Sequence, residues 1–180
     1  MRRAALLAVL LGPLVASCND GPVTCPSVDF ADGGLPDGAA GFTLVVGTED
    51  ASHSKVATPW TDGLHVPFLS THGDWHVEPS VDVTTPAPLP ENGGHVACLR
   101  VRMTASSPGG YPLTPVDTDV LVRRTGGTTS TYHVPPLEGT LGYDRGSVDG
   151  YPTRITISVL ADSGGGSATL TVVPDSMATP

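Results

Sequence analysis

The chain has 180 residues, which is the size of one domain with a short extension. Its formal net charge is −9, and it becomes −11 if Arg2 and Arg3 are removed with a signal peptide, because seven basic residues then face eighteen acidic ones. An acidic surface is repelled by phosphate backbones and by anionic headgroups. Composition therefore argues against a nucleic-acid-binding protein and against a protein held on a membrane by surface charge alone.

A basic start, an apolar run and a cysteine define the N-terminal region. Arg2 and Arg3 precede an apolar stretch over residues 4–16. The stretch is shorter than the roughly 20 residues of a spanning helix and has the length of a secretory signal. It ends in a branched apolar residue, two small residues and a cysteine: Val15-Ala16-Ser17-Cys18. This order resembles the lipobox of bacterial lipoproteins.

The resemblance implies a cellular location for the protein. Residues 1–17 would be a cleaved lipoprotein signal peptide, and Cys18 would become the first mature residue and carry the lipid, palmitate included. Two or three acyl chains anchor a protein stably, whereas one chain binds only marginally. We therefore expect an exported protein anchored to the bacterial cell membrane or to the outer membrane, a choice that Asn19-Asp20 leaves open. An ordinary cleaved signal with a chance cysteine is the alternative.

Composition divides the mature chain into three parts. Residues 18–41 are rich in Gly, Pro and Asp, which predicts a flexible tether after the lipidated cysteine. Residues 42–174 alternate apolar and polar positions, which predicts a single β-domain. Residues 175–180 follow Pro174 and are expected to form a disordered tail.

Short alternating runs predict strands along the domain, and Pro67 and Pro79 mark the early ones as edge or interrupted strands. The longest run, 95–105, places Ala97, Leu99, Val101 and Met103 on one face and Cys98, Arg100, Arg102 and Thr104 on the other. A closing hairpin is predicted over 155–172, with its turn at Asp162–Gly166. The other runs are 42–46, 64–68, 75–77, 81–83, 120–123 and 130–134.

These runs predict the fold class. Seven to nine short strands with turn signals about every ten residues indicate an all-β antiparallel sandwich. The closing hairpin resembles the last strands of bacterial immunoglobulin-like domains, and this resemblance implies an immunoglobulin-like sandwich.

Two cysteines remain once Cys18 carries lipid. An even pair in an oxidising compartment predicts a disulfide between Cys25 and Cys98. Alternation places Cys98 on the face that carries the arginines, so the bridge should fix the tether across the outside of the sheet. Two free thiols are the alternative.

The histidines of residues 65–76 are the candidate metal ligands. His65, His72 and His76 lie within twelve residues. Neutral imidazole is a good ligand for zinc or copper, and three ligands plus water is the arrangement of a catalytic zinc. The competing interpretation is that these histidines are simply solvated.

The sequence favours a lipid-anchored envelope protein that acts as a non-catalytic binding or structural module. Its expected partners are the membrane, through the lipid, and an envelope protein or glycan, with no nucleic acid. No cofactor is expected besides the covalent lipid. The alternative is a metal-dependent envelope enzyme or metal-binding protein that uses His65, His72 and His76.

Overall fold

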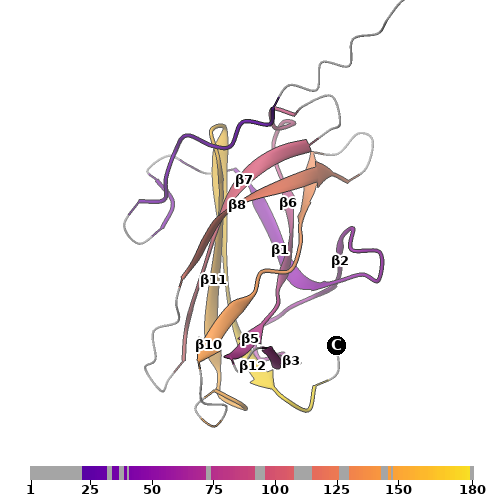
Figure 1. Cartoon of the computed structure of the whole chain (residues 1–180), viewed down its shortest axis with the longest axis vertical. Helices are drawn as coiled ribbons and strands as arrows, with labels where there is room; N and C mark the ends of the chain where they lie inside the picture. The colour runs from indigo at the N-terminus through magenta and orange to yellow at the C-terminus, as the bar shows by residue number, and fades with distance from the viewer. Residues whose placement is uncertain are drawn as a thin grey trace, which may run out of the picture.

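The computed structural model describes residues 22–31, 34–36, 39, 41–71, 74–91, 96–107, 115–125, 130–142, 146 and 148–178. Cys18 and the rest of the lipobox, together with His72, lie outside the described residues. Within them the fold is all-β, with twelve strands and no α-helix (Figure 1). The strands are β1 (Thr43–Glu49), β2 (Val56–Pro59), β3 (His65–Pro67), β4 (Leu69–Thr71), β5 (Asp74–Val77), β6 (Ser80–Thr84), β7 (Val96–Ser106), β8 (Val116–Arg124), β9 (Thr131–Val134), β10 (Gly139–Gly142), β11 (Thr153–Ala161) and β12 (Gly164–Asp175).

Nine strands form one curled sheet in the order β2-β1-β6-β9-β8-β7-β11-β12-β3. The joint between β9 and β8 is narrow: Arg123 pairs with His133 and Arg124 with Tyr132. The sheet bends at this joint, so β2-β1-β6-β9 forms one layer and β8-β7-β11-β12-β3 the other. The expected all-β sandwich-like fold is confirmed, with one parallel pairing, between β12 and β3.

The two layers also meet along their other side. Phe42, just before β1, donates its backbone N–H to the carbonyl of Gly165 in β12 at 3.1 Å. A Cβ on Gly166 would lie 2.6 Å from the Phe42 carbonyl oxygen, so only a glycine lets the layers approach this closely. The glycines that the sequence assigned to a turn are therefore strand residues, and β11 and β12 are joined by Asp162 and Ser163 alone.

The core lies between the layers and follows the period-2 alternation of the strands. The predicted inner face of β7 is confirmed: Ala97, Leu99 and Val101 are fully buried and Met103 is 3% exposed. Most of the other core side chains are aliphatic, and Trp60, Phe68 and Tyr132 are the aromatic ones; the aliphatic ones include Val46, Val81, Val83, Val122, Val134, Ile155, Ile157, Val159 and Val172.

A second, three-stranded sheet in the order β10-β5-β4 covers one end of the sandwich (Figure 1). It approaches β7 so closely that a Cβ on Gly139 would overlap the end of the Met103 side chain. Trp75 in β5 stacks on Phe68, with ring centroids 4.9 Å apart. No predicted run covers β10, because its residues are glycine and threonine apart from Leu141 and show no apolar alternation.

The ordered domain extends beyond both predicted boundaries, residues 42 and 174. Asp175 is the last residue of β12, and Ser176 donates its backbone N–H to Asp149 Oδ1 at 3.0 Å. The residues 175–178 that were expected to be a disordered tail are thus hydrogen-bonded to the domain. At the other end, residues 25–31 of the expected tether lie against the sheet.

Alanine at position 166 should separate the two layers. We expect Gly166→Ala to lower the free energy of unfolding by about 1–3 kcal/mol, because the clash is with backbone and a packed Leu44 rather than with a mobile side-chain end. Gly34→Ala is the matched control, since nothing lies within 4 Å of its added Cβ. Urea denaturation of both variants measures the difference, and equal midpoints would argue against the close contact.

Candidate functional site

The N-terminal strap, residues 22–31, crosses the outer face of the second layer (Figure 1). Its strongest attachment is the disulfide between Cys25 and Cys98 of β7, whose Cα atoms lie 4.8 Å apart. Ser27 adds a second attachment, because its backbone N–H and its hydroxyl both donate to Asp162 Oδ1, at 3.0 and 3.2 Å. The predicted bridge across the outside of the sheet is therefore present.

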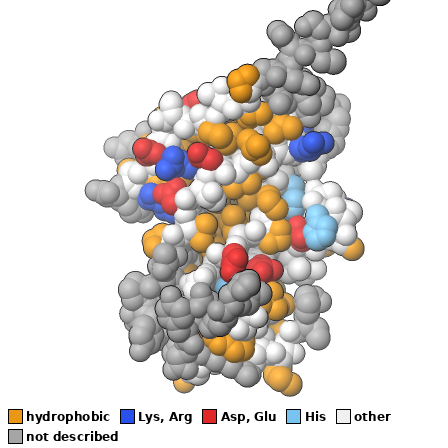
Figure 2. All heavy atoms as spheres, viewed as in Figure 1, with side chains coloured by type: hydrophobic (Ala, Val, Ile, Leu, Met, Phe, Trp, Pro, Cys, Tyr) orange, Lys and Arg blue, Asp and Glu red, His pale blue; other side chains and the backbone are white. Residues whose placement is uncertain are grey.

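A group of ion pairs continues the attachment along β7 and β8. Arg100 Nη1 lies 3.0 Å from Asp29 Oδ1 in the strap, and its Nε donates to Asp117 Oδ1 at 3.2 Å. Arg102 donates from Nη2 and Nε to Asp117 Oδ2, at 2.7 and 3.1 Å. Basic and acidic side chains alternate over this part of the surface (Figure 2). Cross-strand register explains the pairing, because Arg102 lies opposite Asp117.

Phe30 covers the end of this charged group. Its side chain is 7% exposed, and the guanidinium carbon of Arg102 lies 4.6 Å from the centroid of its ring. Such a cation–π contact contributes about 0.5–2 kcal/mol, depending on desolvation. Arg102 Nη1 also donates to the Ala31 carbonyl at 3.4 Å. The strap is thus held at both ends and in the middle.

The loop before β7 closes around the disulfide. Tyr132 accepts the backbone N–H of Leu89 at 2.8 Å and donates its hydroxyl to Glu91 Oε1 at 2.6 Å. Burial, followed by the hydrogen bond to Glu91, raises the pKa of Tyr132 to about 12. A small cavity of about 70 Å³ remains between this loop, the disulfide and the β11–β12 turn; it is lined by Thr24, Pro26, Leu89, Pro90, Cys98, Ala161 and Asp162.

Beside the strap lies a wider groove on the outer face of β7, β8 and β11, with a volume of about 370 Å³. Its lining offers polar groups, because it includes Thr104, Thr156 and Ser158 together with the Arg102–Asp117 pair. Hydroxyls and a charged pair on an open face can bind a polar partner by hydrogen bonds.

The candidate metal ligands that the structure describes have separate carboxylate partners. His65 in β3 is exposed, and its Nδ1 lies 2.9 Å from Asp175 Oδ2. Asp175 has a lowered pKa, first because it accepts the backbone N–H of Met177 and second because of His65. His76 in β5 is fully buried, its Nε2 lies 3.0 Å from Glu78 Oε1, and its Nδ1 has no hydrogen-bond partner among the described residues.

The metal hypothesis includes His72, which lies outside the described residues. The residues that the structure does describe contain no group of three or more His, Cys, Asp or Glu side chains placed to hold a metal ion. The three-histidine site stays a prediction.

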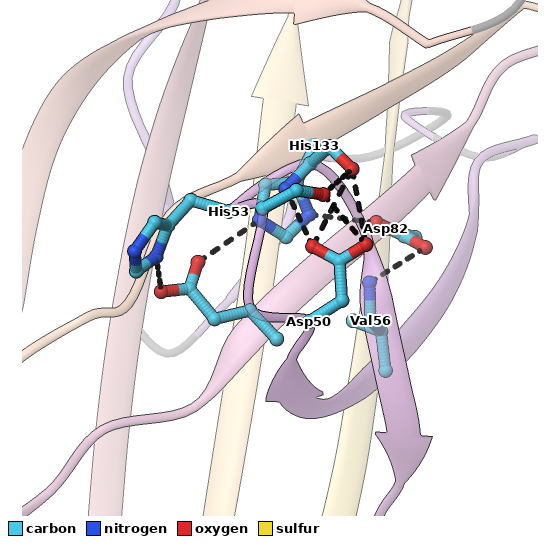
Figure 3. A network of polar contacts seen from close by, with 8 residues as sticks. Asp50, His53, Val56, Asp82 and His133 are labelled. Carbon is cyan, nitrogen blue, oxygen red and sulfur yellow. Dashed lines mark hydrogen bonds and ion pairs between the residues drawn. The ribbon is translucent and has the colours of Figure 1, made fainter.

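A histidine network that the sequence analysis missed lies on the outer face of the first layer (Figure 3). His133 of β9 is 7% exposed, with Nδ1 2.8 Å from Asp82 Oδ1 and Nε2 3.4 Å from Glu49 Oε2. The other oxygen of Glu49 contacts Nδ1 of His53.

This network fastens the loop between β1 and β2 to the sheet. Asp82 Oδ2 accepts the backbone N–H of Val56 at 3.1 Å, while Asp50 accepts the backbone N–H of Ser54 at 2.9 Å. The Ser54 bond is the main reason that the pKa of Asp50 is lowered to about 2. Alternation between Tyr132 and Val134 places His133 on the outer face, but nothing in the sequence indicates that a loop covers it. The arrangement is suited to holding a loop in place.

No family model, no curated protein and no solved structure matches this chain. None of the described residues forms a helix that is long and apolar enough to cross a membrane.

Loss of the disulfide should weaken the fold measurably. The bond closes a sequence separation of 73 residues, and the chain-entropy model gives such a loop about 4 kcal/mol. We expect the double variant Cys25→Ser/Cys98→Ser to unfold at lower urea concentration than the oxidised protein. Intact mass should rise by two daltons on reduction of the wild type and stay constant in the variant. An unchanged wild-type mass would show two free thiols instead.

Proposed function

We propose that this protein is an exported, lipid-anchored, non-catalytic binding or structural module of the bacterial cell envelope. Cys18 carries the lipid and residues 22–31 join it to the β-sandwich. The observation that supports this most is the strap itself. A chain segment that begins soon after the lipobox is fastened to the sheet by a disulfide, by Ser27–Asp162 and by Arg100–Asp29.

A disulfide suits the proposed location. Disulfides persist in oxidising compartments outside the cytosol, and small exported domains use them where their cores are lean. The core here is lean in this sense, because only 5% of the residues are aromatic. The charge of the chain also favours a covalent lipid over surface charge as the means of attachment.

The envelope partner proposed for this module is a protein or a glycan. The polar groove beside the strap is the surface that suits such a partner best, since hydroxyls and an Arg–Asp pair provide both donors and acceptors. Sandwich folds host many functions, and the site rather than the fold determines the ligand.

The anchor is tested by replacing the lipidated residue. Cys18→Ala should move the protein from the membrane fraction to the soluble exported fraction, because no acyl chain can then form on residue 18. Metabolic labelling with radioactive palmitate should mark the wild type and leave the Cys18→Ala variant unlabelled. Cys25→Ser/Cys98→Ser is the control, since it removes thiols without touching the lipobox. Membrane retention of the Cys18→Ala variant would refute the anchor.

Metal content separates this proposal from the metal-dependent alternative. We expect elemental analysis of protein purified without chelators to find far less than one zinc or copper per chain. His65→Ala is the informative variant, because His65 is exposed and its loss disturbs no core packing. Stoichiometric metal that disappears in His65→Ala would favour the metal-dependent function.

A further inference from the structure

We infer that the Cys25–Cys98 disulfide limits the length of the free tether, a role that we call the leash stop. It keeps the sandwich close to the lipid surface and determines which end of the sandwich faces the bilayer. The inference rests on the proposed lipidation of Cys18. The inference adds a fixed orientation to membrane attachment, since a lipoprotein with a long free tether would be equally membrane-bound but would have no fixed orientation.

The length of the free chain limits how far the domain can lie from the lipidated residue. Cys25 follows Cys18 by seven residues, so the free segment spans at most about 23–25 Å when fully extended. A tether running to Phe42 would have 24 residues and a reach of about 80–86 Å. For a flexible chain, the root-mean-square end-to-end distance is about 25–29 Å for 24 residues and about 13–16 Å for seven residues. The bond therefore removes most of the distance that the domain could otherwise move from the bilayer.

Several attachments prevent the domain from rotating about the disulfide. A domain held by one bond can swivel about it, whereas the strap is fixed at Cys25, at Ser27 through Asp162, and at Asp29 through Arg100. These contacts lie in sequence along one face, so they set the direction in which the chain leaves the domain. Thr24 lines the small cavity together with Ala161 and Asp162, and the chain departs at that end.

The geometry of β12 shows which end faces away. β12 begins at Gly164, next to the strap, and ends at Asp175 (Figure 1). Eleven residue steps at about 3.3 Å place these ends roughly 36 Å apart. The lipid surface is thus the partner of the end formed by the disulfide, the β11–β12 turn and the loop before β7. The opposite end, with β5 and β10, faces outward.

Energy transfer to labelled lipids tests the orientation. Lys55 is the single lysine of the chain, so Lys55→Arg provides a background in which one new lysine carries an amine-reactive donor. One protein adds Ser163→Lys, in the β11–β12 turn, and the other adds Met177→Lys, which is 84% exposed just beyond β12. Each lipidated protein is reconstituted into phosphatidylcholine vesicles that carry an acceptor lipid. The Lys55→Arg protein without a new lysine measures labelling of the α-amine.

The oxidised protein should transfer several-fold more efficiently from position 163 than from position 177. A released variant, with Cys25→Ser, Cys98→Ser, Asp162→Ala, Asp29→Ala and Phe30→Ala, removes the strap attachments at Cys25, Ser27, Asp29 and Phe30 and should lose most of this difference, with circular dichroism confirming that it is folded. Equal transfer from both positions in the oxidised protein, or a difference that survives release, would overturn the leash stop.

Vesicle flotation in the same samples separates the two proposals. Protein that floats and transfers equally from both positions keeps the lipid anchor and loses the leash stop. Protein that does not float refutes the anchor and, with it, the leash stop. If the released variant unfolds, the double variant Cys25→Ser/Cys98→Ser replaces it, and a smaller but clear reduction of the difference is then expected.

Discussion

The close contact between β1 and β12 is the constraint on which the sandwich depends. The chain has few aromatic side chains, so aliphatic side chains fill most of the space between the layers. Aliphatic side chains are short, so the layers have to approach closely to exclude water and to keep the contacts that dispersion attraction requires. Gly166 makes this approach feasible, because any larger residue there would meet Phe42 and Leu44 and hold the layers apart. The rest of the core follows from the alternation of each strand.

The outer faces of the two layers are stabilised in different ways. The second layer is crossed by the strap, and its charged side chains pair across strands and with the strap itself. The first layer is covered by the β1–β2 loop, which His133, Glu49 and Asp82 hold in place. Exposed ion pairs contribute little singly, so the disulfide dominates the attachment of the strap. The two covers leave the groove along β7, β8 and β11 as an open polar surface.

Much of the fold could be predicted from the sequence because it follows local alternation. The two faces of β7 are examples, and the outward position of Cys98 led directly to a bridge across the outside of the sheet. Contacts that depend on distant segments could not be predicted. Glycines in a closing hairpin resemble a turn until a second layer is known to touch them. His133 resembles a solvated strand residue until a loop from another part of the chain covers it.

The disulfide also determines how a mechanical load would pass through the molecule. Any pull on the chain before Cys25 enters the fold at Cys98, in β7, which is hydrogen-bonded to strands on both sides. The residues between Cys25 and β1 are then bypassed and carry no tension. The first layer, with its loop and its histidine network, is shielded from the force. A domain built in this way can be pulled from its N-terminal side without separating its first strand from the sheet.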